Sequence, residues 1–98
     1  MTQKDKARFR ASKLWKDFRK TMSIRFGRRD AITGRLLRRG FNLHHLCEKQ
    51  YTDLTESNFI PLNKQTHEFL HWLYRYENYE EILEKLKYYI DEMRSLNR

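Results

Sequence analysis

The chain contains almost no cysteine. Cys47 is the single cysteine among 98 residues, so the chain can form no internal disulfide and no Cys-x-x-Cys zinc site. This usage fits a reducing compartment, and we expect a cytoplasmic protein. Cys47 itself is expected to be a small, half-buried side chain.

Long apolar runs are also absent. No segment approaches the roughly 20 consecutive apolar residues that are needed to span a bilayer. The first residues, Met1 to Asp5, are polar and basic, unlike the hydrophobic stretch of a signal peptide. We therefore expect a soluble protein with no membrane partner, and its length allows one small domain.

Proline and glycine are scarce, and their positions mark breaks between regular elements. Gly27 is expected to end a first helix, Gly34 marks a turn and Gly40 precedes a strand, while Pro61 belongs at a strand end or edge. Apolar periodicity predicts a helix over residues 6–26, strands over 41–45 and 59–62, and helices over 64–76 and 79–96. A loop is expected over residues 47–57.

This order of elements predicts an α+β fold. A core of two short strands and a helix, residues 30–76, is flanked by a basic N-terminal helix within 1–29 and an amphipathic C-terminal helix within 77–98. The last helix carries an apolar seam with alternating steps of three and four residues. Its partner is either the N-terminal helix of the same chain or a second copy in a homodimer.

Positive charge is in excess. Lysine and arginine number 21 against 13 acidic residues, which gives a net charge of +8, and the excess lies mainly between Lys4 and Arg39. Such a segment favours a polyanion, and nucleic acid is preferred over membrane headgroups or a merely solvated face. Arg35, Arg38 and Arg39 are the candidates for phosphate contacts.

All four histidines fall between residues 44 and 71. His67 and His71 are four residues apart on the expected helix, so their side chains share one face, about 5 to 6 Å apart at Cβ. His44 and His45 are neighbours on the expected first strand, so they point to opposite faces. Imidazole is both a frequent metal ligand and a base suited to neutral pH, with an unperturbed pKa of about 6.5.

Two segments resemble a known family. "GFNLHHL" at residues 40–46 is followed by "NFIPLNKQTHEFLHWL" at residues 58–73. Over residues 30–72 the order of strand, loop, strand and helix resembles the HNH endonucleases, the ββα-metal nucleases. The spacing of the asparagine and the helical histidines is similar to colicin-type DNases, and "DAITGRLL" is similar to small phage and prophage HNH proteins.

The resemblance implies a role for each matching residue. It implies that His44, His67 and His71 bind a divalent metal ion. It also implies that His45 is the general base that deprotonates the attacking water. Asn58 would orient this base through the loop, or would itself touch the metal.

One departure from the family concerns a second metal. Many relatives carry a cysteine pair for a structural zinc, and Asn63 and Thr66 stand at those places here. No second zinc is therefore expected. For the first site, three neutral nitrogen ligands favour zinc, nickel or cobalt, whereas magnesium and manganese sites generally contain carboxylates, which Glu48 and Glu68 could supply.

Two classes of function remain open at this point. The first is a metal-dependent DNA endonuclease in which the metal stabilises the leaving group. The second is a non-catalytic nucleic-acid-binding or protein-binding module of HNH fold, such as a phage-encoded partner of a larger enzyme. In the second class the histidines would hold a zinc ion that only stabilises a small domain.

Overall fold

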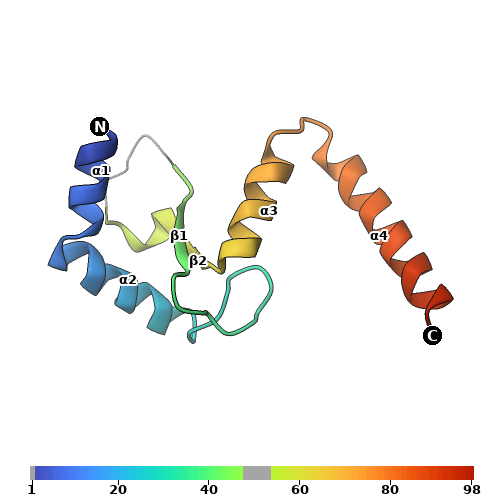
Figure 1. Ribbon diagram of the computed structural model, residues 1–98, viewed down its shortest axis with the longest axis horizontal. Helices are drawn as coiled ribbons and strands as arrows, with labels where there is room; N and C mark the ends of the chain where they lie inside the picture. The colour runs from blue at the N-terminus through green and yellow to red at the C-terminus, as the bar shows by residue number, and fades with distance from the viewer. Residues whose placement is uncertain (1, 48–53) are drawn as a thin grey trace. The chain divides into compact units, whose positions relative to one another are not determined.

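The structure is a computed structural model that describes residues 2–47 and 54–98. Over these residues the chain is α+β, with the elements labelled in Figure 1. They are α1 (Gln3–Arg10), α2 (Lys13–Arg25), β1 (Asn42–His45), the 3-10 helix η2 (Glu56–Asn58), β2 (Phe59–Leu62), α3 (Lys64–Tyr74) and α4 (Tyr79–Leu96). The chain divides into two compact units, Met1–His67 and Glu68–Arg98, and the division falls within the continuous helix α3.

The prediction of a single helix over residues 6–26 is wrong. The segment forms two helices, because Ser12 caps the second one: its Oγ accepts the backbone N–H of Trp15 at 3.2 Å. The Ser12 hydroxyl also donates to the carbonyl of Phe9, the last turn of α1, at 2.5 Å. A serine that bonds nearby backbone competes with the helical pattern, and here it turns the chain between the two helices.

The end of the second helix agrees with the expectation. α2 stops at Arg25, and Gly27 adopts a left-handed conformation with φ of 64°, which favours glycine because it has no Cβ. The following loop folds back on itself. The Asp30 N–H donates to the Arg35 carbonyl at 2.7 Å, and the Leu37 N–H donates to the Arg28 carbonyl at 2.8 Å, so the chain turns around Gly34 as expected.

The two strands pair antiparallel, as a hairpin. Leu43 lies opposite Pro61, and His45 lies opposite Phe59. Leu43, Phe59 and Pro61 are buried, so this face of the hairpin packs into the core. The strand bounds 59–62 and the helix bounds 79–96 are confirmed, while α3 ends at Tyr74 rather than at residue 76.

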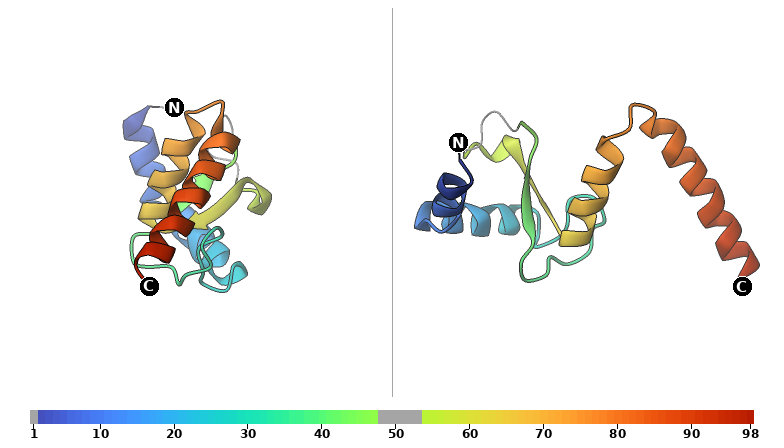
Figure 2. Two further views of the ribbon diagram at one scale, coloured as in Figure 1. Left: turned by 90° about the vertical axis from the view of Figure 1, so that its right-hand side faces the viewer. Right: turned by 45° about the horizontal axis from the view of Figure 1, so that its top comes forward.

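The core of the first unit is small and aromatic. Trp15, Met22, Leu43 and Phe59 form one buried cluster, and α2 packs against β2 (Figure 2). Each such side chain contributes about 1.5–3 kcal/mol when fully buried, so the hairpin depends on α2 for its stability. Partly buried side chains complete the cluster: Phe9, Phe18, Phe26, Phe41 and Leu54.

The second unit exposes most of its apolar surface. None of the 18 residues of α4, all of which the structure describes, is buried. The exposed fractions of Tyr89, Met93 and Leu96 are 63%, 62% and 80%. Within the described residues, no helix combines the length and the apolar character required to cross a membrane.

Candidate metal centre

His44 reaches the site from β1. It lies opposite Ile60 in the hairpin, between Leu43 and His45, whose side chains point to the other face. Leu43 is buried on the side of α2. Because side chains alternate along a strand, burial of Leu43 turns the His44 imidazole away from that core and towards α3.

His67 and His71 reach the site from α3, where they are four residues apart and share one helix face. The helix begins after Asn63, whose carbonyl accepts the N–H of His67 at 2.9 Å. Leu73 is buried and Leu70 half-buried. Leu73 follows His71 by two residues and therefore lies on another face of α3.

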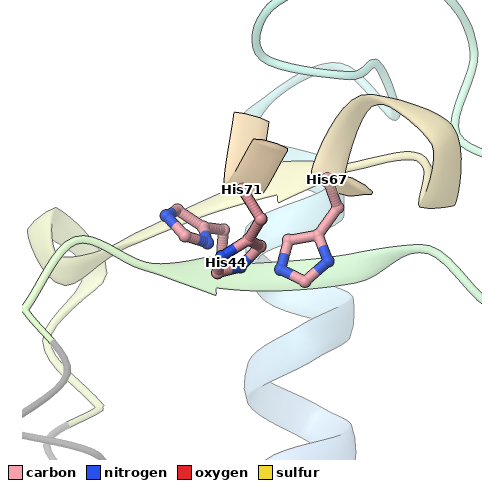
Figure 3. A group of neighbouring side chains, drawn as sticks. All are labelled: His44, His67 and His71. Atoms are coloured by element: carbon pink, nitrogen blue, oxygen red, sulfur yellow. The ribbon is translucent and has the colours of Figure 1, made fainter. Parts of the chain in front are cut away.

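The three imidazoles lie together, as Figure 3 shows. One possible ligand atom from each of His44, His67 and His71 lies within 4.8 Å of the others, and all three residues are half-buried. The rings of His44 and His67 are 5.3 Å apart at their centroids and inclined by 65°. Three nitrogens around a tetrahedral zinc, bound at about 2.0–2.1 Å, would be roughly 3.4 Å apart, so small ring rotations could complete the coordination.

The donor set is all nitrogen. Among the described residues, the histidine cluster includes no carboxylate. Of the two carboxylates considered as additional ligands, Glu68 is exposed and lies outside the cluster, and Glu48 lies outside the described residues. Neutral imidazoles favour zinc, nickel or cobalt over magnesium.

His45 lies on the opposite face of β1 and packs against aromatic rings. Its imidazole is stacked parallel to the Trp15 indole, with centroids 6.4 Å apart and planes inclined by 7°. The centroid of the Phe59 ring lies 4.6 Å from that of the His45 imidazole. His45 is half-buried, so it belongs to the rim of the aromatic core as well as to the strand that carries His44.

Asn58 holds the chain just after His45. Its side-chain Oδ1 accepts the N–H of Cys47 at 2.9 Å, and its backbone carbonyl accepts the N–H of Leu46 at 2.9 Å. Asn58 is buried, whereas Cys47 is exposed and not half-buried as expected. The asparagine thus fixes the backbone of the two residues that follow His45.

Asp30 is a residue whose importance sequence reasoning missed. It is only 2% exposed, and its carboxylate accepts the N–H groups of Ile32, Thr33 and Asn63 at 2.8, 2.9 and 2.8 Å. The Thr66 side chain also bonds to it. The signal was an aspartate at the start of "DAITG", where Asx turns are common, but sequence does not show that such a turn is buried.

Asn63 and Thr66, at the places of the absent cysteine pair, therefore both contact Asp30. Asn63 further ties the loop before β1: its Oδ1 accepts the N–H of Arg38 at 2.8 Å, and its Nδ2 donates to the Leu36 carbonyl at 3.0 Å. These bonds tie the Asn63 side chain to this loop. A hydrogen-bond network joins the two segments here.

The three arginines expected to contact phosphate line one cleft. Arg35, Arg38 and Arg39 share its walls with Arg29 and Lys64, and all of these side chains are exposed. The four arginines lie in the loop between α2 and β1, and Lys64 is the first residue of α3. The cleft belongs entirely to the unit Met1–His67.

Comparisons with known proteins identify no relative. No family model matches the chain, and no curated protein or solved structure is significantly similar to it. The resemblance to HNH endonucleases therefore depends on the residues and spacings of this sequence alone.

Proposed function

We propose that the chain is a metal-dependent endonuclease of the HNH type that hydrolyses DNA phosphodiester bonds. The gathering of His44, His67 and His71, from a strand and a helix distant in sequence, is the single observation that supports this most. The antiparallel hairpin followed by α3 is compatible with a ββα core.

In this proposal the three clustered histidines hold one divalent ion. Such an ion, when bound, polarises a phosphodiester and offsets the charge that develops on the leaving oxygen. His45 accepts the proton of the attacking water. Attacking and leaving oxygens lie on opposite sides of phosphorus, so the base and the ion would act from different sides of the scissile phosphate.

Asn58 supports the base indirectly. Through Leu46 and Cys47 it fixes the backbone after His45, and a fixed backbone limits the positions open to the imidazole. Asn58 is thus a positioning residue in this proposal, because its side-chain oxygen accepts a backbone N–H. Burial of such an amide is favourable only while its hydrogen bonds are made.

A second function is favoured by a specific observation. The packing of His45 against Trp15 and Phe59 is also what a structural aromatic side chain would do. In that case the clustered histidines bind a zinc ion that stabilises the fold, and the basic surface serves a nucleic-acid-binding or protein-binding module without catalysis.

Plasmid cleavage distinguishes these two functions. Metal-stripped protein is incubated with supercoiled plasmid and magnesium, manganese, cobalt, nickel or zinc in turn. We expect relaxation or linearisation that requires an added ion and is lost in His67→Ala and in His45→Ala. Cleavage that survives His67→Ala at the same rate would contradict the proposed centre.

The binding-module function predicts a different pattern. Zinc would raise the melting temperature, DNA would bind, and no ion would support cleavage by the unmodified chain. The His45→Ala variant serves as a control, because it should still bind zinc through the three remaining histidines.

A further inference from the structure

The unit Met1–His67 contains a large basic cleft apart from the histidine cluster. Its volume is about 1140 Å³, and five cations line it: Arg29, Arg35, Arg38, Arg39 and Lys64. Among the described residues, no acidic side chain lines this cleft. Its volume exceeds the roughly 300–1,000 Å³ of a small-molecule pocket, which fits a segment of a polyanion better than a small metabolite.

The backbone that carries these arginines is held in place. Asn63 bonds to Arg38 and to Leu36, and Arg29 donates from Nη1 to the Gly34 carbonyl at 2.9 Å. Asp30 fixes the same loop to the residue before α3. The walls are therefore ordered before any ligand arrives, which reduces the entropic cost of binding.

A second basic cleft lies along α2. It measures about 280 Å³ and is lined by the cations Lys16, Arg19, Lys20 and Arg28, again without an acidic side chain among the described residues. Phe41 lines both clefts. The guanidinium of Arg19 lies 3.7 Å from the centre of the Phe41 ring and donates to the Phe41 carbonyl at 2.6 Å, so one residue joins the two basic walls.

Both clefts adjoin the elements that carry metal ligands. Phe41 immediately precedes β1, and His44 follows it by about 10 Å at the rise of a strand. Lys64 and His67 are three residues apart on α3, hence neighbours on its surface at about 5–6 Å. A strand of nucleic acid that passed Lys64 along α3 would reach His67 within a few nucleotides.

We infer that the two clefts, joined at Phe41, form one path for the phosphate backbone of a nucleic-acid strand and hold nucleotides next to those at the metal centre. The claim that this strand is also the substrate rests on the proposed function, whereas the claim that the clefts bind it does not. Recognition is by phosphate charge and is independent of base sequence.

The shape of the surface favours nucleic acid over an anionic membrane. The cations line concave walls, where a strand can enter and contact several of them at once. A flat bilayer surface would reach only the outermost side chains. Exposed apolar residues near the loop, such as Ile32 and Leu36, make a membrane the alternative to be tested.

The test is a binding measurement in EDTA with the full chain, so that no cleavage takes place. Fluorescence anisotropy of a labelled DNA oligonucleotide gives the affinity over a range of salt. The cleft variant is Arg38→Gln/Arg39→Gln/Lys64→Gln. Its matched control, Lys85→Gln/Arg94→Gln/Arg98→Gln, removes the same charge from exposed residues outside both clefts.

We expect the cleft variant to lose tenfold or more in affinity and the control to lose much less. Each phosphate contact contributes about 0.9 to the slope of log affinity against log salt, so the cleft variant should lower this slope by about 2 to 3. Lys16→Gln/Lys20→Gln should weaken binding further, more for long oligonucleotides than for short ones.

Three outcomes would overturn the inference. The first is an equal loss of DNA affinity in the cleft variant and the control, and the second is no loss of DNA affinity in either. The third is binding to vesicles of phosphatidylcholine and phosphatidylserine that is tighter than binding to DNA and needs the same three cations. Circular dichroism verifies folding, and Arg38→Lys/Arg39→Lys, which keeps the charge, should bind nearly normally. Failure of cleavage with every metal would reject the nuclease proposal but leave this result intact.

Discussion

The carboxylate of Asp30 accepts the backbone N–H of Asn63 at 2.8 Å and so joins the loop after α2 to the start of α3. This one bond connects the wall of the basic cleft to the helix that carries His67 and His71. Burial by itself would raise the pKa of the Asp30 carboxyl, but hydrogen bonds from Thr33, Asn63, Ile32 and Thr66 outweigh it, and the pKa lies below its usual value.

Asp30→Asn should therefore destabilise the fold. The substitution removes the charge and turns an amide N–H₂ towards groups that donate hydrogen bonds, so we expect a loss of about 1–3 kcal/mol in the free energy of unfolding. Urea unfolding followed by circular dichroism measures it. Asp17→Asn, at an exposed position of α2, is the control and should change stability by less than about 0.5 kcal/mol.

The same carboxylate predicts a pH dependence. Since its pKa is lower in the folded than in the unfolded chain, its contribution is complete above the unfolded pKa of about 3.9 and is lost as pH falls through the folded pKa. Unmodified protein should lose stability steeply below about pH 4. The Asp30→Asn variant should lose less stability over that range. Parallel curves of unfolding free energy against pH for the two proteins would show that Asp30 does not cause the loss.

Local patterns predicted much of this molecule. The positions of the two strands, the end of α2 near Gly27 and the helical pair His67 and His71 all follow from periodicity, glycine placement and side-chain alternation. Each of these depends on a few neighbouring residues. The convergence of His44 with the helical pair was expected only because a family resemblance supplied the tertiary arrangement.

Other features could not be predicted, because they depend on contacts between distant segments. In the sequence, Ser12 is compatible with the interior of a helix and with a cap. The cap forms together with the packing of Trp15 in the core. Asp30 reads as an ordinary turn residue until Asn63 and Thr66 reach it. The stacking of His45 on Trp15 likewise joins β1 to α2, although the two residues are 30 positions apart in the sequence.

Removal of the Asn58 side chain should loosen the loop after His45. Asn58→Ala leaves the Cys47 N–H without its 2.9 Å acceptor, and we expect a loss of about 1–3 kcal/mol in stability. Asn58→Asp keeps an acceptor oxygen and should lose less. If Asn58 positions His45, both variants should bind zinc normally, and Asn58→Ala should lower kcat more than it raises KM.

Zinc should stabilise the unmodified protein through the clustered histidines. At a zinc concentration of about 100 times Kd the gain is about 2.7 kcal/mol, which corresponds to a rise of roughly 10 °C or more in the melting temperature of a domain this size. His44→Ala, His67→Ala and His71→Ala should each reduce the rise, because each removes a zinc ligand. The loss of zinc affinity should exceed the roughly 10–100-fold that follows removal of a group that only hydrogen-bonds to a ligand. His45→Ala should keep it, and a rise that is equal in all four variants would place the zinc elsewhere.

His45→Phe separates the two roles that the structure leaves to His45. Phenylalanine fills a similar volume against Trp15 and Phe59, so stability should change by less than about 1.5 kcal/mol, and zinc binding should persist. It cannot accept a proton, however, so a base at this position predicts that cleavage falls by about 10²–10⁴-fold. A His45→Phe protein that cleaves plasmid normally would show that this ring only packs, and the base would then have to be sought elsewhere in the chain.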